Sequence, residues 1–533
     1  MSTPVLQHES VHHESAPAQG SGGGADQRSA PDVQPAEPTA LSGLAAQSAE
    51  RRAKRDALQA QGINPYPTRF ERSATLAELH SAHAGLEPDT RTGEVARVAG
   101  RVVSMRGHGK LRFVTIEDAN SAIQLMFQAD HLPADTAAVE ALVDLGDWVG
   151  VTGEVITSRR GELSVDVTGL EILAKALRPL PDKWYGLNEA ETRYRQREVD
   201  LLANKESRRV FDIRFRTLSI LRDRLEAQAF VEVETPILQP QAGGALARPF
   251  FTHANALDAE FSLRIAPELY LKRLVVGGYE RVFEIARNFR NEGIDTRHSP
   301  EFTALEAYRA FGDFHDGMDL TEHLIAEAAQ GAAGRLEFDF AGQRVDLTPP
   351  WPRRDLLDML EERLGRRVHP SMPTADLRTI CEANDVPYLP SWGSGKLIFE
   401  LYDKILMSQT VGPVFIYHYP TEVSPLARQS PDDPTLTDRF ELVIGGRELA
   451  NGYSELNDPD EQARRFQAEA AAAAGGDVEA HPADIAFVRA LEYGLPPTSG
   501  IGIGIDRLIM LFAEVQAIRD VILFPIMRPE ALS

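Results

Sequence analysis

The sequence predicts an α+β protein in which a small β-barrel precedes a larger domain built around an antiparallel sheet. Between about residues 95 and 175, about five short segments alternate apolar with polar residues, and one helix-like segment interrupts them, which suits an OB-type barrel. Barrels of this type commonly bind single-stranded nucleic acid. Downstream, long strands and helices follow one another without regular alternation, which favours an antiparallel sheet over a doubly wound parallel one.

The 533 residues of the chain are enough for two or three domains. The first stretch is rich in Gly, Ser, Pro, Ala and Gln and has almost no large apolar residue, so it cannot bury enough surface to offset the entropy of ordering. We expect a disordered tail at 1–45, a basic helix and lead-in at 46–94, the barrel at 95–177, a linker at 178–209 and the large domain at 210–533.

The lead-in opens with a helix-like stretch that ends at Gly62. This stretch carries a basic cluster, which consists of Arg51, Arg52, Lys54 and Arg55. Two interpretations stay open: the cluster lies on a solvated helix face, or it contacts phosphate groups. The net charge of -23 argues against a protein that coats nucleic acid through bulk charge, but it does not exclude local basic surfaces.

The hydropathy pattern, the N-terminal sequence and the cysteine count exclude several classes of protein. No apolar run approaches the roughly 18 to 20 residues that a membrane span needs, and the N-terminus resembles neither a signal peptide nor a transit peptide. We therefore expect a cytoplasmic protein without membrane contact. The single cysteine, Cys381, rules out an intramolecular disulfide framework and a cysteine metal cluster, and its helix-like surroundings predict a buried, inert thiol.

Two glycine-rich stretches imitate nucleotide-binding loops but fail on spacing. In "WGSGKL" the phosphate loop would need a glycine where Pro390 stands. In "GIGIGIDR" the third glycine of a dinucleotide fingerprint would fall at Arg507. The sequence also lacks a zinc-type His-Glu-x-x-His motif and a nucleophile elbow, so its chemistry must lie elsewhere.

The stretch "FRNEGIDTRHSPEFTALEAY", residues 289–308, predicts a charged β-hairpin. Residues two apart on a strand share a face, which gives the following set: Arg290 and Glu292 on the first strand, and Phe302, Ala304, Glu306 and Tyr308 on the second. A solvated sheet face would explain scattered charges about as well. The flanking segments "YERVFEIA" and "ALEAYRAF" put apolar residues on both faces, which favours a binding site.

A second hairpin is predicted in "RFELVIGGRELANGYSELND", with its turn near the Gly-Gly pair. Alternation brings Asn451, Tyr453 and Glu455 to one face. Glu448 has the opposite parity, so it joins the same site only if a β-bulge intervenes.

The last strand-like segment, "GIGIGIDRLIMLF", alternates glycine with isoleucine and then continues as a helix. The isoleucine face can pack a core. The glycine face leaves room for a flat ligand to approach the backbone.

The stretches "FVEVETPILQP", "FRNEGIDTRHSPEFTALEAY" and "GIGIGIDRLIMLF" resemble motifs 1, 2 and 3 of the class II aminoacyl-tRNA synthetases. The segment "ARPFFTHANALDAEFSLRIAPELYLKRLVVGGYERVFEI" resembles the lysyl-tRNA synthetases of bacterial type. The likeness runs from about residue 45 to the C-terminus. It implies a class II antiparallel-sheet catalytic domain, an N-terminal OB-fold anticodon-binding domain and a homodimer with Pro236 of motif 1 at its interface. The implied activity is ligation of lysine to tRNA(Lys) through lysyl-adenylate, with ATP as substrate and Mg²⁺ as cofactor.

By this resemblance the first hairpin binds ATP. Attack on the α-phosphate builds charge on the phosphoryl oxygens, so a positioned cation matters more than a general base. Arg290 would hold the α-phosphate, and Arg507 would cover the adenine and reach the γ-phosphate, so both are expected to be catalytic. The other expected ligands are Glu292 at the adenine amino group, Phe302 under the adenine, Arg297 and His298 at the outer phosphates, and Glu441 and Glu448 as magnesium carboxylates.

The resemblance also implies an acidic pocket for lysine. The ammonium group of a lysine side chain needs carboxylate partners when it is removed from water, because an unpaired buried charge costs roughly several kcal/mol. An aspartyl or asparaginyl relative would need cationic side chains instead. The implied ligands are Glu268 and Glu455 at the ammonium, supported by Tyr308 and Tyr453, and Glu306, Asn451 and the backbone near Gly244 at the α-amino and carboxylate end.

In the barrel, Phe113, Gln124 and Glu162 match family positions that stack on and hydrogen-bond a uridine-rich anticodon. The alternative for Phe113 is a place in the barrel core. The basic cluster of the first helix would add salt-sensitive phosphate contacts.

Two other functions stay open. The same adenylation site could lysylate a translation factor or a lipid, although the lipid version needs membrane spans and the factor-modifying relatives lack the barrel. The chain could also be an RNA-binding protein with an inactive catalytic half. Two positions depart from the family pattern: Glu198 stands where a tyrosine is usual, and Ala450 replaces a glycine common in bacterial relatives.

Overall fold

The computed structural model describes residues 39–108, 110–119, 121–180, 189–245, 247–474 and 483–529. The chain divides into two compact units, Met1–Leu180 and Pro181–Ser533. Most of the segment expected as a disordered tail lies outside the described residues, but its last part is helical because helix α1, Thr39–Ala60, begins there. In the described residues, no helix is long and apolar enough to cross a membrane.

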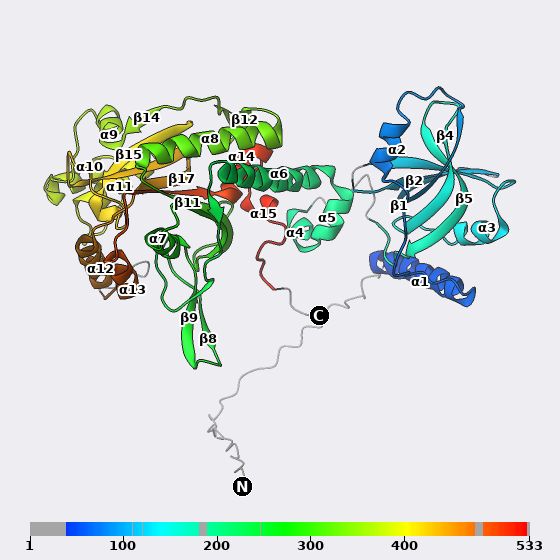
Figure 1. Cartoon of the computed structure of the whole chain (residues 1–533), viewed down its shortest axis with the longest axis horizontal. Coiled ribbons are helices and arrows are strands. Elements are labelled where there is room, and N and C mark those ends of the chain that lie inside the picture. Colours follow the sequence, from blue (N-terminus) through cyan, green and yellow to red (C-terminus); the bar gives the residue numbers. More distant parts are fainter. Residues whose placement is uncertain are drawn as a thin grey trace, which may run out of the picture. The chain divides into compact units, whose positions relative to one another are not determined.

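The first unit is a closed β-barrel flanked by helices (Figure 1). After α1, its elements are α2 Leu76–Ala82, β1 Arg91–His108, β2 Leu111–Glu117, β3 Ala122–Gln128, α3 Ala134–Glu140, β4 Trp148–Thr157 and β5 Leu163–Ala174. The strands close in the order β1-β2-β3-β5-β4, and only β3 and β5 pair in parallel. Helix α3 is the insertion expected between the third and fourth strands, so the predicted barrel is confirmed.

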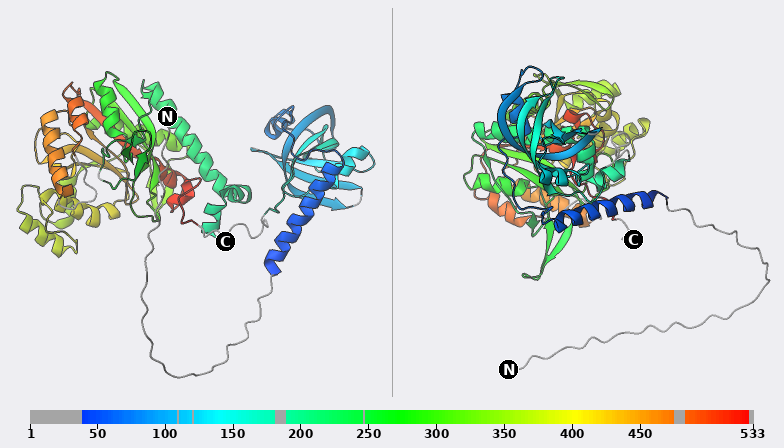
Figure 2. Two further views of the ribbon diagram at one scale, coloured as in Figure 1. Left: turned by 90° about the horizontal axis from the view of Figure 1, so that it is seen from below. Right: turned by 90° about the vertical axis from the view of Figure 1, so that its right-hand side faces the viewer.

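Apolar residues at alternate strand positions fill the barrel, as the pleat requires. Val98, Ile116 and Leu125 are fully buried in this core. Helix α1 lies along the barrel and adds Leu58 to the same core (Figure 2). The helix is therefore part of the folded unit.

The basic cluster of α1 is partly used inside the protein. Arg51 is only 9% exposed, and its Nη1 donates hydrogen bonds to the carbonyl oxygens of Leu145 and Ala176 at 2.9 and 3.1 Å. Lys54 forms an ion pair with Asp144 at 2.6 Å. Arg51 anchors the helix to the barrel, so the expectation of a phosphate contact is wrong for this residue.

The second unit is built on a large mixed sheet that is mostly antiparallel (Figure 1). Its strands are β6 Val231–Glu232, β7 Leu238–Gln239, β8 Phe251–Ala254, β9 Ala259–Leu263, β10 Arg281–Phe289, β11 Glu301–Ala310, β12 Glu337–Phe340, β13 Gln343–Asp346, β14 Arg353–Asp355, β15 Val414–Pro420, β16 Leu436–Ile444, β17 Arg447–Ser454 and β18 Thr498–Gly504. The eight-stranded sheet has the order β14-β15-β16-β17-β18-β11-β10-β6. The pairs β14–β15 and β10–β6 are parallel and the others antiparallel. The predicted α+β class with an antiparallel sheet is confirmed.

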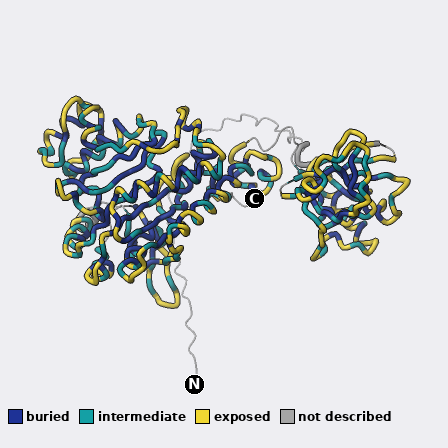
Figure 3. Tube along the Cα trace, turned by 45° about the horizontal axis from the view of Figure 1, so that its top comes forward, coloured by how far each residue is buried: buried dark blue, intermediate teal, exposed yellow. Residues whose placement is uncertain are grey.

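Helices cover one face of this sheet and form satellite clusters at its edges. They are α4 Ala190–Arg195, α5 Arg197–Ala203, α6 Lys205–Ala227, α7 Glu268–Val276, α8 Phe314–Ala333, α9 Leu356–Leu364, α10 Thr374–Ala383, α11 Ser394–Ile405, α12 Pro459–Ala474, α13 Ile485–Leu491, α14 Ile505–Ala513 and α15 Ile518–Val521. Helix α8 packs against β16, β17 and β18, and α6 and α14 pack against α8. Figure 3 shows buried segments in the interior of this unit and exposed segments at its periphery.

The second unit contains the single cysteine and a position at which the chain departs from the family pattern. Cys381 is buried in the cluster formed around α9, α10 and α11, as expected. Glu198 is exposed on α5, so this departure from the family pattern does not bring a charge into the core. The expected linker at 178–209 is partly outside the described residues and partly helical, because α4 and α5 lie within it.

Strand pairing fixes the first hairpin. Strands β10 and β11 pair antiparallel, with Asn288 opposite Phe302. Strand β10 ends at Phe289, so Arg290 and Glu292 lie in the loop beyond it. The expectation that these two residues share a strand face is wrong, because the ladder ends before the charged segment begins.

The bulge expected in the second hairpin is present. The register of β16 against β17 shifts between Leu442 and Val443, which leaves Leu449 as the extra residue. Beyond the bulge, Asn451 Nδ2 donates a hydrogen bond to Glu448 Oε1 at 3.3 Å. The condition under which Glu448 can join the face of Asn451 is therefore met.

Candidate active site

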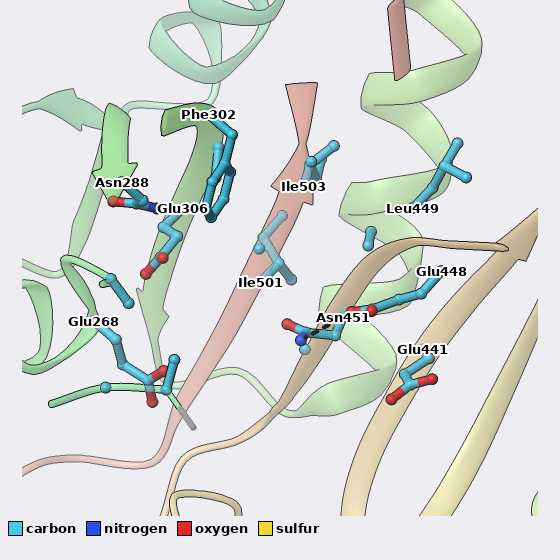
Figure 4. Close-up of a pocket in the computed structure, with 18 of the residues that line it drawn as sticks. Glu268, Asn288, Phe302, Glu306, Glu441, Glu448, Leu449, Asn451, Ile501 and Ile503 are labelled. Carbon is cyan, nitrogen blue, oxygen red and sulfur yellow. Dashed lines mark hydrogen bonds between the residues drawn. The ribbon is translucent and has the colours of Figure 1, made fainter. Parts of the chain in front are cut away.

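A cavity of about 410 Å³ lies over the uncovered face of the large sheet (Figure 4). The first hairpin, the second hairpin and β18 line it, together with the start of α7. All residues expected to bind ATP, lysine or magnesium line this cavity, with the exception of Glu455. Segments far apart in the sequence therefore converge on one place.

Strand β18 gives the cavity a flat floor. Ile501 and Ile503 are buried in the core, while the intervening glycines border the cavity. A Cβ added at Gly502 would lie 3.3 Å from Asn451 Oδ1, which is tighter than ordinary contact. Glycine on this face keeps the backbone accessible to a planar ligand, as the alternation predicts.

Two guanidinium groups border the cavity at one end. The Arg290 guanidinium lies 5.1 Å from the centre of the Phe302 ring, and its buried Nε has no hydrogen-bond partner among the described residues. Burial lowers the pKa of Arg290, and the nearby Glu292 opposes this effect. Arg507 Nη1 donates to the carbonyl oxygen of Glu448 at 2.8 Å. An anion placed here would relieve the cost of desolvating Arg290.

The loop between β10 and β11 forms the open rim of the cavity. Glu292, Arg297 and His298 are all exposed. His298 Nδ1 lies 2.9 Å from Asp295 Oδ2, and this hydrogen bond is the main cause that lowers the pKa of Asp295 to about 2. Glu292, Arg297 and His298 therefore border the cavity from its solvent-exposed side.

Two carboxylates could hold a divalent cation. Burial raises the pKa of Glu441 to about 7; Glu448 adds to this rise and Arg439 opposes it. A cation between the carboxylates would favour their ionised forms. Among the described residues no group of three or more His, Cys, Asp or Glu side chains is arranged to bind a metal. The two carboxylates fit Mg²⁺ if phosphate oxygens and water complete its ligands.

The other end of the cavity is acidic. Glu268, Glu306 and Glu455 are buried there. Tyr453 Oη donates to Glu268 Oε1 at 2.6 Å, and Tyr308 Oη donates to Glu306 Oε2 at 3.1 Å. Burial raises the pKa of Glu306 to about 8, with a further rise from Glu268. Such a niche favours a ligand that brings positive charge.

Comparisons with known proteins agree with this geometry. The family described as tRNA synthetases class II (D, K and N) matches residues 189–528, and the OB-fold nucleic acid binding domain matches residues 96–173. The chain is 47% identical to the lysine–tRNA ligase of Carboxydothermus hydrogenoformans over 472 residues, which cover 89% of this chain and 96% of the relative. The chain belongs to the lysine–tRNA ligase family.

Two further members of the lysine–tRNA ligase family give the same result. The relative from Chromohalobacter salexigens is 49% identical over 493 residues, with 91% of this chain and 97% of the relative covered. The relative from Xanthomonas oryzae is 48% identical over 494 residues, with 91% and 96% covered. The fold is therefore a class II synthetase catalytic domain with an N-terminal OB-fold domain, as the sequence predicts.

The barrel of this family member carries a cluster of side chains from strands β1, β2 and β3 and from the turn before β5. Phe113 is partly exposed and lies outside the barrel core, so the alternative of a core position is wrong. Gln124 is buried, and its Oε1 accepts from Arg106 Nη2 at 2.7 Å. Arg106 also lies 3.6 Å from Glu162 and 6.0 Å from the Phe113 ring centre. Arg106 thus joins the three expected anticodon residues.

Sequence reasoning missed four residues in or beside the candidate site and the barrel cluster: Arg106, Lys272, Asn288 and Arg439. Lys272 is four residues after Glu268 on α7, a spacing that places both on one helix face and that could have identified it. Asn288 shares a sheet face with its partner Phe302, and its buried Oδ1 has no partner among the described residues. Arg439 contacts Glu441 Oε1 at 2.6 Å, a pairing that i, i+2 strand spacing also predicts.

The raised pKa of Glu306 makes a stability prediction. The Glu306 carboxyl has a folded pKa near 8 instead of 4.5, so its contribution to the free energy of unfolding is fully present below pH 4.5 and is lost as the pH rises to about 8. Glutamine at this position does not titrate. We therefore expect the free energy of unfolding of wild type, minus that of Glu306→Gln, to fall by on the order of a few kcal/mol between low and high pH. Denaturant unfolding of both proteins across this range checks the prediction, and a difference that does not change with pH contradicts it.

Proposed function

We propose that the chain ligates L-lysine to tRNA(Lys) in two steps through a lysyl-adenylate. One observation supports this most strongly: a niche with three buried carboxylates adjoins a glycine-floored cavity that two arginines border. The niche suits a cationic side chain, and the cavity suits a nucleotide. The sequence identity to lysine–tRNA ligases supports the same assignment.

In the first step an oxygen of the lysine carboxylate attacks the α-phosphorus of ATP, and the bond to the β-phosphate oxygen breaks as pyrophosphate leaves. Arg290 stabilises the charge that develops on the α-phosphoryl oxygens, because its Nε lacks a partner in the described residues. Phe302 and Arg507 hold the adenine between them, and Glu292 accepts from its amino group. Arg297 and His298 contact the outer phosphates from the rim. Glu441 and Glu448 would hold Mg²⁺, which would supply charge neutralisation on the phosphates.

Lysine lies across the floor with its side chain in the acidic niche. Glu268 and Glu455 accept from the ε-ammonium, with Tyr308 and Tyr453 beside them. Glu306, Asn451 and the backbone at Gly244 orient the α-amino and carboxylate groups. This orientation brings the carboxylate to the α-phosphate. In the second step a hydroxyl of the terminal tRNA adenosine attacks the lysyl carbonyl carbon, and AMP leaves.

Adenylation measured with each of the twenty amino acids, followed by tRNA charging, tests the function. We expect ATP–pyrophosphate exchange with lysine and then transfer of lysine to tRNA(Lys). Exchange with aspartate in place of lysine would contradict the assignment. Exchange with lysine but transfer to a protein acceptor, and none to tRNA, would favour the alternative of a modifying enzyme. Since its proposed task is translation, we expect the protein in the cytoplasm.

The barrel is proposed to bind the anticodon through Phe113, Gln124 and Glu162. We expect Phe113→Ala to raise the KM for tRNA about tenfold and to leave lysine-dependent exchange unchanged, because stacking on one base is worth about 1–3 kcal/mol. Aminoacylation kinetics with varied tRNA check this. Val95→Ala removes an exposed apolar side chain of β1 and is the matched control. An equal loss in the control would contradict stacking by Phe113.

The chain is proposed to form a homodimer through the motif 1 region. Val231, Ile237 and Leu238 are 48%, 44% and 48% exposed, and Val231 lies on the edge strand β6 of the large sheet. Such apolar edges are usually covered. We expect light scattering to give twice the mass of one chain, and Leu238→Glu to shift this toward the monomer. Leu257→Glu, at a 69% exposed position, is the control. A monomeric wild type would contradict the proposal.

A further inference from the structure

A lysine of the chain itself lies beside the acidic niche. Lys272 has no exposed surface, and its Nζ lies 2.7 Å from Glu268 Oε1. The same Nζ contacts Glu455 Oε2. The two carboxylates proposed to receive the substrate ammonium are therefore already joined by an internal ammonium.

Aromatic rings and apolar side chains surround the Lys272 ammonium. Its Nζ lies 5.5 Å from the Tyr453 ring centre and 5.8 Å from the Phe487 ring centre. The helix residues beside it, Leu271 and Val275, are buried in the same apolar cluster. Burial lowers the pKa of Lys272, but the stronger combined attraction of the two carboxylates raises it. Burial also raises the pKa of Glu455 well above its usual value, and Lys272 is the main group that opposes this rise. Withdrawal of the ammonium would move a charge into apolar surroundings, which is costly.

The internal ammonium leaves part of the carboxylate pair free. Glu455 Oε1 has no hydrogen-bond partner among the described residues and is buried. It lies 1.9 Å from the position that a Cβ of Gly500 would occupy, on the glycine strand that borders the cavity. This oxygen is an acceptor available to a ligand. Glycine at position 500 is what leaves space for it.

We propose that Lys272 is a positioning residue that acts as a fixed counter-ion: it holds Glu268 and Glu455 together, favours their ionised forms and reduces the charge of the ionised pair to a single net negative charge. One added ammonium then neutralises the pair, and lysine binds with less release of protons from these carboxylates than it would without Lys272. The inference rests on the proposed function, since it takes lysine to be the ligand.

Loss of Lys272 would couple lysine binding to protonation. The titratable groups around Nζ are Glu268 from α7, Glu306 and Tyr308 from β11, Tyr453 from β17, Glu455 just beyond it, and Glu284 from β10, which is already paired with Arg264. Two buried carboxylates without a cation between them share a proton. Lysine must then displace that proton, in addition to the one that Glu306 releases when it pairs with the α-ammonium.

The test is calorimetry of lysine binding to the full chain, in buffers of different ionisation enthalpy, which counts released protons. We expect Lys272→Met to release about one proton more than wild type at about pH 7, and its KM for lysine to be raised about tenfold there and to approach wild type near pH 8.5. The KM for ATP should stay within about twofold. Arg273→Met changes the exposed neighbour on α7 and should match wild type.

Three outcomes would overturn the inference alone: an unchanged proton count in Lys272→Met, a KM raised equally at every pH, or tighter lysine binding, which would make Lys272 a competitor of the substrate. Should Lys272→Met not fold, Lys272→Arg retains the charge and must release the same number of protons as wild type; an extra proton there also overturns it. Absence of lysine-dependent exchange in the wild type would instead overturn the proposed function, and this inference with it.

Discussion

Arg290→Ala is expected to lower lysine-dependent ATP–pyrophosphate exchange by about 10³-fold, because loss of one preorganised cation at a developing charge costs on the order of 3–4 kcal/mol. The Arg290 side chain makes few internal contacts that its loss would break, since Nε has no partner among the described residues. The fall should therefore lie in kcat, with a near-normal melting temperature. Exchange kinetics and thermal unfolding, measured together, check both parts.

Arg287 supplies the matched control for Arg290. It lies on the same strand, β10, but its side chain is 44% exposed and pairs with Glu301 at 3.4 Å. Arg287→Ala removes the same positive charge from the hairpin and should leave exchange within about twofold of wild type, as expected for an exposed pair. Normal exchange in Arg290→Ala would contradict its role at the phosphate. Absence of exchange in the wild type as well would favour an RNA-binding protein with an inactive catalytic half.

The parts of the site that could be predicted from the sequence follow from strand periodicity. Alternation placed Glu306 and Tyr308 on one face, and the parity of Glu448 required the bulge that the register of β16 and β17 contains. The glycine–isoleucine alternation of β18 separated a core face from a ligand face. These are local properties, so a single sequence can express them.

The parts that could not be predicted depend on distant partners. The end of β10 at Phe289 is set by where the ladder with β11 stops, and this moved Arg290 off the strand. Arg51 is buried because the carbonyl groups of Leu145 and Ala176 lie against α1, 94 and 125 residues away in sequence. A basic stretch has the same composition whether its side chains are exposed to water or buried against carbonyl oxygens. Composition alone therefore could not distinguish a buried arginine from an exposed one.

Glu455→Gln is expected to raise the KM for lysine by about 10²- to 10³-fold, because removal of one partner from a buried charge pair costs roughly 3–5 kcal/mol. Glutamine keeps the volume of glutamate but removes the charge. Lys272 would still contact Glu268 at 2.7 Å, so the fold should survive. The KM for ATP should change little, since Glu455 lies in the acidic niche, whereas the two arginines expected to bind ATP border the other end of the cavity.

Glu301→Gln is the control for this substitution, because Glu301 lies on the same sheet and is 37% exposed beside Arg287. It should leave the KM for lysine unchanged. Equal losses of lysine and ATP affinity in Glu455→Gln, or a melting temperature far below wild type, would mean that Glu455 supports the fold and does not determine specificity for lysine. A selective loss for lysine would instead locate specificity in the carboxylates of this niche, since a neutral amide cannot compensate a desolvated ammonium.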